Sequence, residues 1–249
     1  MRATLPIPGP GETLDRLAGE WWIFQLQRGH RYATDDVLTA WKGICACPRA
    51  HSVLDLGCGV GSVGLMALLL LPDGARLTSI EVQETSAGLL RKTLLYNQLC
   101  DRVVLVREDL RRAVLESRYE LVLANPPYLR AGSATRSPVA QRAGARLELC
   151  GDIFDFCMAA ARAISASGRF CFCFAASDPR PEEAIRVAGL TLLERQEVVP
   201  RANRPPLLAL YTCGRTGARR DPPPIIVRNA DGSRTESFRA IRRQLLIEA

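Results

Sequence analysis

Apolar and polar positions change their spacing regularly between His51 and Cys213. Short apolar runs predict buried strands, and stretches with apolar residues one helical turn apart predict helices. The expected strands cover residues 52–56, 76–82, 102–108, 119–124, 169–176, 190–199 and 206–213. The expected helices cover residues 35–44, 63–71, 84–99, 109–117, 153–164 and 181–188. Strands that alternate with helices of this length are typical of parallel βαβ units, so the pattern predicts an α/β fold with a mostly parallel sheet.

The two ends of this pattern are less regular. The last two expected strands follow each other without a helix, which predicts an antiparallel hairpin at one edge of the sheet. Thr34 or Asp35 is expected to cap the first helix. Residues 1–28 are expected to form an N-terminal extension, residues 29–213 the α/β domain, and residues 214–249 a basic C-terminal extension. In that extension a Pro-rich break precedes an apolar segment, a turn at 230–232 and a helix from about Thr235.

The composition excludes several classes of protein. The chain has 249 residues, 47% of them apolar, which is enough for one domain with a substantial core. The longest apolar run, 63–71, is too short to cross a bilayer, and no apolar signal stretch opens the chain, so a cytoplasmic protein is expected. Nine cysteines without a C-x-x-C pair and only two histidines argue against a metal site and for reduced, buried thiols.

The charge balance indicates a polyanionic partner. The formal net charge is +7, and of the 33 basic residues only Lys42 and Lys92 are lysine. A basic surface attracts nucleic acid. The coding bias of a GC-rich genome explains the preference for arginine over lysine equally well, but it does not explain the positive sign.

A glycine turn follows the first buried strand, in the stretch Val53–Gly61. Gly57, Gly59 and Gly61 allow the backbone to approach a ligand where a Cβ would clash, and the helix behind them offers free N–H groups. A glycine turn alone is weak evidence, because nicotinamide-binding folds use one too. Asp55 makes it more specific, since a carboxylate there would repel a pyrophosphate but attract the cationic amino acid portion of S-adenosylmethionine.

Two further acidic residues end the next two expected strands. Glu81 follows Gly57 by 24 residues, a position from which a carboxylate can accept both ribose hydroxyls of an adenosine. Asp109 ends the following strand and can accept from the adenine amino group of the cofactor. An N-cap role for Asp109 in the expected helix 109–117 is the alternative, and the two roles are compatible.

The stretch Asn125-Pro126-Pro127-Tyr128 ends the expected strand 119–124 and carries the chemistry. Two prolines stiffen the turn and remove backbone donors, which leaves the Asn125 side-chain oxygen and the Pro126 carbonyl as fixed acceptors. An exocyclic NH2 group has two hydrogens to donate and a lone pair delocalised into its ring. Two acceptors that pull both hydrogens out of the ring plane localise that lone pair for attack on a methyl group. Tyr128 offers an aromatic face on which a planar substrate can stack.

These motifs, in this order, resemble those of class I S-adenosylmethionine-dependent amino methyltransferases. The segment Thr34–Leu38 and the stretch Arg146–Glu148 further resemble one bacterial branch, which methylates N6 of an adenine beside the anticodon of a valine tRNA. The resemblance runs from about Gly29 to Cys213. It implies a seven-stranded Rossmann-like methyltransferase sheet with S-adenosylmethionine as cofactor.

The same resemblance implies roles for individual residues. Cofactor binding falls to Asp35, Asp55, Gly57, Gly59, Gly61, Glu81, Asp109 and Asn125. Catalysis falls to Asn125, Pro126 and Tyr128, and no metal takes part. Substrate binding falls to Tyr128, Arg130, Arg136, Arg142, Arg201 and Arg204, of which the first three arginines lie in a loop with no acid before Glu148. RNA, in particular tRNA, is the expected partner, and a solvated loop is the alternative interpretation of these arginines.

Other functions remain open at this stage. Glutamine-N5 and guanine-N2 methyltransferases use similar turns, but the former generally carry a helical domain before the glycine loop and the latter commonly have Phe where this chain has Tyr128. A non-catalytic RNA-binding protein that keeps the fold is the alternative from another class. A nicotinamide oxidoreductase is disfavoured by Asp55 and by the spacing of the glycines.

Overall fold

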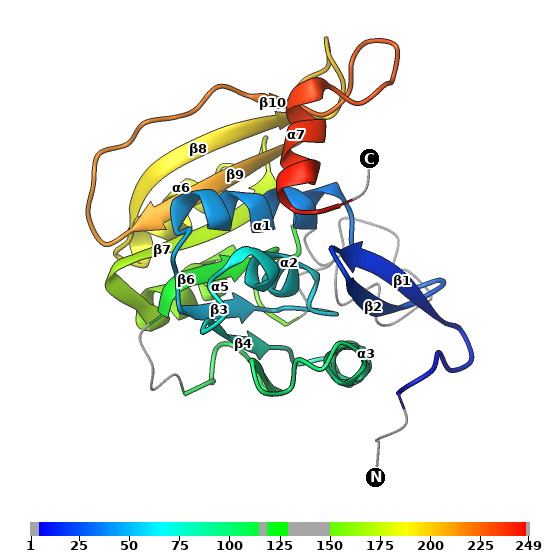
Figure 1. Ribbon diagram of the computed structural model, residues 1–249. Helices are drawn as coiled ribbons and strands as arrows, with labels where there is room; N and C mark the ends of the chain where they lie inside the picture. Colours follow the sequence, from blue (N-terminus) through cyan, green and yellow to red (C-terminus); the bar gives the residue numbers. More distant parts are fainter. Residues whose placement is uncertain (1–4, 115–118, 129–149, 248–249) are drawn as a thin grey trace.

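A computed structural model describes residues 5–114, 119–128 and 150–247 of the chain. Its centre is an eight-stranded sheet with helices on both faces (Figure 1). The strands of this sheet are β3 (Ser52–Leu56), β4 (Arg76–Ile80), β5 (Val103–Val106), β6 (Tyr119–Ala124), β7 (Ile164–Ala175), β8 (Thr191–Val199), β9 (Leu208–Gly214) and β10 (Ile225–Ile226). The helices are α1 (Thr34–Ala46), α2 (Ser62–Leu70), α3 (Glu84–Tyr96), α5 (Ile153–Ala163), α6 (Arg180–Val187) and α7 (Glu236–Gln244).

The sheet confirms the predicted fold class. Its order is β10-β8-β9-β7-β6-β3-β4-β5, and only β9 runs against its neighbours. The antiparallel hairpin β8–β9 is present, but β10 pairs in parallel with β8 and adds an eighth strand outside it. Strand order reverses beside β3, which lies between β4 and β6. Ligands bind beyond the carboxyl ends of the strands at such a switch point.

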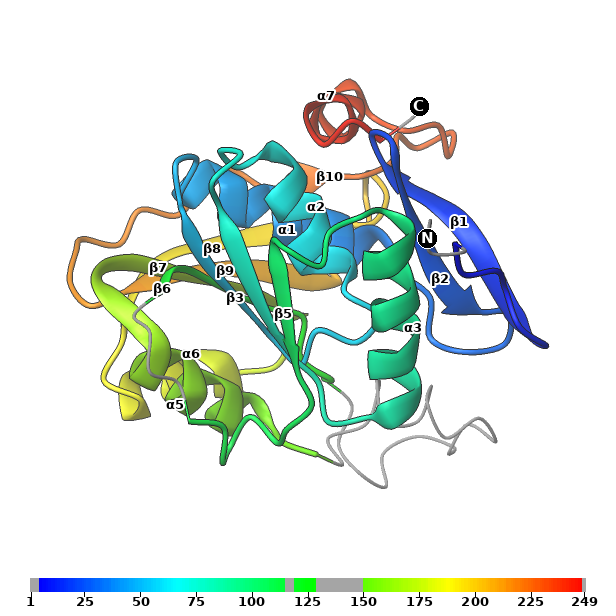
Figure 2. The ribbon, with the colours of Figure 1, turned by 60° about the horizontal axis from the view of Figure 1, so that its bottom comes forward.

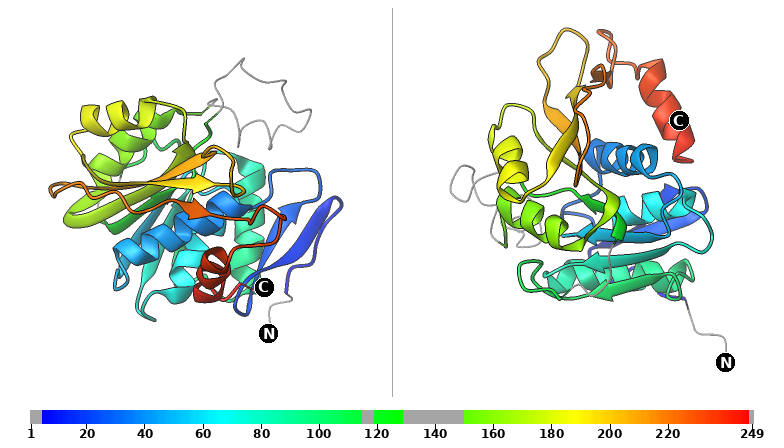
Figure 3. Two further views of the ribbon diagram at one scale, coloured as in Figure 1. Left: turned by 90° about the horizontal axis from the view of Figure 1, so that it is seen from above. Right: turned by 90° about the vertical axis from the view of Figure 1, so that its left-hand side faces the viewer.

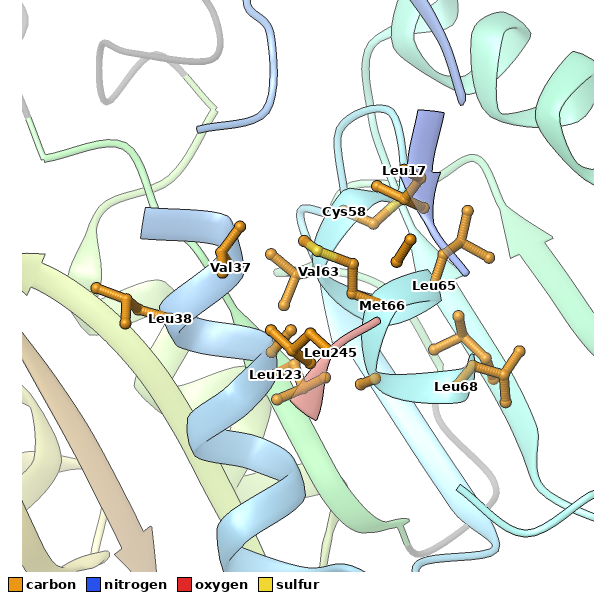
Figure 4. Packing of buried hydrophobic residues seen from close by; sticks show 14 of the residues in the cluster. Leu17, Val37, Leu38, Cys58, Val63, Leu65, Met66, Leu68, Leu123 and Leu245 are labelled. Atoms are coloured by element: carbon orange, nitrogen blue, oxygen red, sulfur yellow. The ribbon is translucent and has the colours of Figure 1, made fainter. Parts of the chain in front are cut away.

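Two apolar cores fill the space between the sheet and its helices. One core joins α1, α2 and α3 with the sheet, and the other lies under α5 and α6 on the opposite face (Figure 2). In the first core, Val37 of α1 and Met66 of α2 pack near Leu17 and Leu245 from the two ends of the chain (Figure 4). Burial of these side chains holds α1, which carries Asp35, against the sheet close to the carboxyl ends of the strands where the site forms.

The N-terminal segment forms a hairpin that the sequence analysis did not predict. Strands β1 (Glu12–Ala18) and β2 (Trp21–Leu26) pair antiparallel and dock on α3. The amide of Phe24 donates to Thr93 Oγ1 of α3 at 3.0 Å. The amide of Gly19, in the hairpin turn, donates to the Leu246 carbonyl at 2.8 Å, so the hairpin and the C-terminal segment lie side by side (Figure 3). The division into 1–28, 29–213 and 214–249 stays a prediction.

Two local predictions were wrong. Residues 109–114 contain only a turn at 110–112, not the start of a helix, and the Asp109 carboxylate accepts from the backbone amide and side chain of Arg111 there. The N-cap of α1 is Ala33, not Thr34 or Asp35. Asp36 takes over the capping bond, since its Oδ2 accepts from the Ala33 amide at 2.8 Å.

Candidate active site

The predicted motifs lie together beyond the carboxyl ends of the neighbouring strands β3, β4 and β6. The glycine turn follows β3, Glu81 follows β4, and Asn125–Tyr128 follow β6. Two adjoining pockets open there. The first is lined by residues that include Asp55, Gly57, Gly59, Glu81 and Asn125. The second is lined by residues that include Asp35, Asn125, Pro126 and Tyr128. Asn125, Pro127 and His30 line both pockets, so this turn lies where the two meet.

The glycine turn leaves an open cradle in the first pocket. Gly59 has φ +57°, and a Cβ built on it meets no atom within 4 Å, so the space beside its backbone is free. Gly57 has φ +62°, and a Cβ there would come within 2.9 Å of Phe156 Cζ. Glycine is therefore required at both positions, at Gly57 by packing as well as by the backbone. Gly61 does not line the pocket but forms the N-cap of α2.

Glu81 is tied to this turn. Its Oε2 accepts from the Gly59 amide at 2.8 Å, and its Oε1 accepts from the Gln83 amide at 2.7 Å. Burial raises the pKa of this carboxyl above its ordinary value. A carboxylate has about four lone-pair sites, and the backbone amides of Gly59, Gln83 and Val82 use at most three, so Glu81 can hold the turn and still accept from a ligand hydroxyl. The ribose-binding role of Glu81 stays a prediction.

Two more buried carboxyls lie deeper in the first pocket. Asp55 Oδ2 accepts from the Gly64 amide of α2 at 2.9 Å, and burial raises the pKa of Asp55 to about 8. Asp36 also lines the pocket, and burial together with neighbouring Asp35 raises the pKa of Asp36 to about 7. Raised values of this kind mark a site that lacks positive charge of its own and would be relieved by a cationic ligand.

Asn125 is held by three side chains from distant parts of the sequence. Its Nδ2 donates to Asp35 Oδ2 at 3.2 Å and to Asp36 Oδ1 at 3.3 Å. Its Oδ1 accepts from the Cys173 thiol of β7, with 2.9 Å between sulfur and oxygen. No local signal in the sequence marks Asp36 or Cys173, because Asp36 has the position of an ordinary acid at a helix start and Cys173 that of a core residue.

The remaining predicted residues lie in different places. Tyr128 lines the second pocket, and its ring meets Phe174 edge to face with centroids 6.1 Å apart. Asp109 does not line the first pocket, because its carboxylate faces Arg111, and the neighbouring Glu108 lines the pocket instead. The adenine-binding role of Asp109 stays a prediction, with Glu108 as a second candidate.

The predicted arginines divide into two groups. Arg130, Arg136 and Arg142 lie outside the described residues. Arg201 and Arg204 are exposed on the β8–β9 loop, which also contributes Leu207 to the second pocket. The Ala202 amide of this loop donates to the Arg228 carbonyl at 2.8 Å, so the C-terminal segment lies beside it.

Comparison with known proteins shows which family and which solved structures this chain resembles. Residues 44–154 match the family described as Methyltransferase small domain. A predicted O-methyltransferase from Agrobacterium tumefaciens superposes with a TM-score of 0.65 at 19% identity, covering 87% of this chain and 99% of that one. A ribosomal protein L11 methylase from Lactobacillus delbrueckii superposes with a TM-score of 0.52 at 14% identity, covering 73% of this chain and 78% of that one. These structures share the fold.

The first pocket also fits the cofactor of this class. Gly59 leaves space where any side chain would intrude, and Asp36, Asp55 and Glu81 are buried carboxyls suited to a cationic adenosine derivative. The fold is that of these solved methyltransferase structures, residues 44–154 match the family, and the lining of the first pocket fits S-adenosylmethionine.

Curated relatives point to one branch of this class. A protein from Bacteroides thetaiotaomicron named tRNA1(Val) (adenine(37)-N6)-methyltransferase is 33% identical over 100 residues, which is 39% of this chain and 40% of that protein. A protein of the same name from Escherichia fergusonii is 24% identical over 216 residues, 85% of this chain and 86% of that protein. The first alignment thus spans less than half of its relative, and the second spans most of it.

Two kinds of feature do not occur among the described residues. Within 5–114, 119–128 and 150–247, no helix is long and apolar enough to cross a membrane. No group of three or more potential metal-ligating side chains occurs in that part of the chain.

The raised carboxyl pKa values predict that cofactor binding depends on pH. Asp36 and Asp55 hold protons near neutral pH in the ligand-free protein, and a cationic ligand favours their ionised forms. Affinity for S-adenosylmethionine should therefore rise between pH 6 and 7.5, by up to about tenfold per pH unit for each proton released. Calorimetric titration in two buffers of different ionisation enthalpy measures those protons, and buffer-independent heats would contradict the prediction.

Asp36 and Asp55 also determine whether the folded protein gains or loses stability as pH rises. Because their folded-state pKa values lie above those of the unfolded chain, their contribution is fully present below about pH 4 and is lost as pH rises through 7 to 8. The ligand-free protein should thus melt at a lower temperature at pH 8 than at pH 6.

Proposed function

We propose that the protein transfers a methyl group from S-adenosylmethionine to N6 of an adenine in a tRNA, in the cytoplasm. The observation that carries this proposal is the position of Asn125, where a pocket fit for the cofactor meets a second pocket. The second pocket has Pro126 and the aromatic ring of Tyr128 in its lining, as a flat base with an exocyclic amine requires. The names of the curated relatives support the same substrate.

The residues of the turn supply orientation and polar contacts. S-adenosylmethionine, when bound, supplies an electrophilic methyl group on a sulfonium. Asn125 Oδ1 and the Pro126 carbonyl accept the two hydrogens of the amine and draw them out of the ring plane, which localises the nitrogen lone pair. Tyr128 holds the base by stacking, after the base has left its own stack. A protonated N-methyl aryl amine is acidic, so it loses its extra proton to water without a strong general base.

A glutamine side-chain amide in a protein is one alternative acceptor for the same turn. Guanine N2 is the other amine that the turn could grip. We also propose that residues 1–28 and 214–249 are extensions of a methyltransferase domain at 29–213.

The proposed substrate class is tested by offering RNA and protein acceptors together in one cell extract. Purified protein and labelled S-adenosylmethionine are added to an extract from cells that lack the gene, and RNA and protein fractions are counted separately. We expect label in the tRNA fraction with wild-type protein and none with Asn125→Ala. Label confined to protein would support the glutamine alternative, and no label with intact cofactor binding would support a non-catalytic RNA-binding protein.

Arginines near the second pocket should make RNA binding sensitive to salt. Arg201 and Arg204 are exposed, and the charge of Arg201 helps to lower the pKa of Asp231. If each contacts one phosphate, the double variant Arg201→Gln/Arg204→Gln should lower the log–log salt slope by about 1.4 for single-stranded RNA. Arg186→Gln, an exposed change on α6 near the opposite end of β8, is the matched control and should leave the slope unaltered. Equal slopes in all three proteins would remove these arginines from the RNA surface.

A further inference from the structure

We propose that Asp35 and Asp36 are positioning residues that fix the carboxamide of Asn125 in one orientation and strengthen its oxygen as an acceptor. This inference rests on the proposed function of the Asn125 turn. The sequence predicted no function for Asp36 and only cofactor binding for Asp35. The proposal gives both acids a role toward Asn125.

The geometry leaves the carboxamide one favourable orientation. Both hydrogens of Asn125 Nδ2 are used, one by Asp35 Oδ2 at 3.2 Å and the other by Asp36 Oδ1 at 3.3 Å. Both acids are buried, with 9% and 4% of their surfaces exposed, so water cannot easily replace either bond. Turning the group by 180° would place Oδ1 against two carboxylates, which is repulsive when they are ionised. The acids therefore select the rotamer in which Oδ1 points away from them.

Asp36 connects this amide to the rest of the site. Its Oδ2 accepts from the Ala33 amide at the start of α1, and its Oδ1 also accepts from Ser62 Oγ at 2.9 Å. Ser62 is the first residue of α2, directly after the glycine turn. One carboxyl thus joins α1, the cofactor turn and the Asn125 turn, and it lines the cofactor pocket itself.

The partner of Oδ1 leaves the oxygen usable. Cys173 is fully buried in β7, and its thiol is a weak donor. A carboxamide oxygen has two lone pairs, so Oδ1 can keep this contact and accept a stronger donor as well. Anionic acceptors on Nδ2 push electron density toward Oδ1, because hydrogen bonds in a chain polarise one another at low dielectric. An amine hydrogen should bind more strongly to Oδ1 when Asp36 is ionised.

The charge of Asp36 depends on its surroundings and on the cofactor. Burial and Asp35 raise its pKa to about 7, so a neutral acid is common in the ligand-free protein. A neutral Asp36 can itself donate to Oδ1, and it then no longer selects one rotamer. The titratable groups that face it are Asp35 on its own helix, Tyr32 before that helix, Asp55 on β3 and Cys173 on β7, with His30 in the same pocket lining. A cation in this pocket favours the ionised form and hence the oriented Asn125.

The orientation is tested without any methyl transfer. The side-chain amide resonances of Asn125, assigned by their absence in Asn125→Ala, are followed from pH 6 to 8.5 in isotope-labelled protein. We expect them to shift with a midpoint near pH 7 in wild type and to lose this transition in Asp36→Asn, which keeps an acceptor oxygen but not the charge. Asp155→Asn is the matched control, because Asp155 caps α5 from the same helix position, with its Oδ2 3.1 Å from the Asp152 amide.

Kinetics test the consequence for the reaction. At saturating cofactor and RNA, the single-turnover rate of Asp36→Asn should be about tenfold lower than wild type at pH 7.5. Asp155→Asn should keep the wild-type rate and pH profile at a similar melting temperature.

The outcomes separate this inference from the proposed function. Asn125 resonances that do not titrate, or that titrate alike in wild type and Asp36→Asn, would overturn the inference whatever the enzyme methylates. A wild-type rate and pH profile in Asp36→Asn would overturn it as well. A protein whose Asn125 titrates as expected but that methylates no RNA would leave the positioning role standing and refute the proposed function.

Discussion

Asn125→Ala should lower the single-turnover rate of methyl transfer by about 100- to 1000-fold, by analogy with the loss of one oxyanion-hole donor. Its Oδ1 contact strengthens as the amine nitrogen becomes tetrahedral, so the loss falls on the transition state more than on the bound substrates. Affinity for S-adenosylmethionine should change little, because Asp55, Glu81 and the glycine turn remain. The rate is measured at saturating RNA, and cofactor affinity by calorimetry on the same protein.

Changes at Tyr128 provide the comparison. Tyr128→Ala should weaken RNA binding by roughly 1–3 kcal/mol, the contribution of one base–aromatic stack, while a saturating RNA concentration restores much of the rate. Tyr128→Phe should be mild, since the ring face is what the base needs. If Asn125→Ala reduced only RNA affinity, the proposed grip on the amine would be wrong. If Tyr128→Phe were as damaging as Tyr128→Ala, the hydroxyl would have its own role.

Asp55→Asn should lose roughly 2 kcal/mol or more of cofactor binding, about 30-fold in Kd. The amide keeps an oxygen for the Gly64 N–H but removes the buried charge that we expect to face the cationic amino acid portion. Asp101→Asn, an exposed change before β5 at the opposite end of the sheet, is the control. The loss should be similar for S-adenosylhomocysteine, which keeps the ammonium but lacks the sulfonium. An unchanged Kd for both ligands would remove Asp55 from the site.

Much of the fold was predictable because the βαβ pattern is encoded locally. The strands β3, β4 and β6 were each expected within two residues of their observed ends, and they place the glycine turn, Glu81 and Asn125 at one edge. The hairpin β1–β2 was not predicted, since its stability comes from docking on α3, where Thr93 Oγ1 and Asn97 Oδ1 accept from its amides. Contacts of this kind join residues about 70 positions apart and leave no local pattern.

The site was predictable only in part, for the same reason. Asn125 and the glycines belong to contiguous motifs, whereas the pair Asp35–Asp36 meets Asn125 across 90 and 89 residues of sequence. The expected helix at 109–117 shows the opposite error. Residues 110–112 form a turn there, in which Asp109 and Arg111 make an ion pair, and helix propensity overestimates the local structure.

The identity of the methylated nucleoside shows directly whether the protein methylates adenine N6 in tRNA. Unmodified tRNA is incubated with wild-type protein and methyl-labelled S-adenosylmethionine, digested to nucleosides and analysed by mass. We expect the label to elute as N6-methyladenosine and to stay at background with Asn125→Ala. Label in N2-methylguanosine, or N6-methyladenosine formed at an undiminished rate by Asn125→Ala, would contradict it.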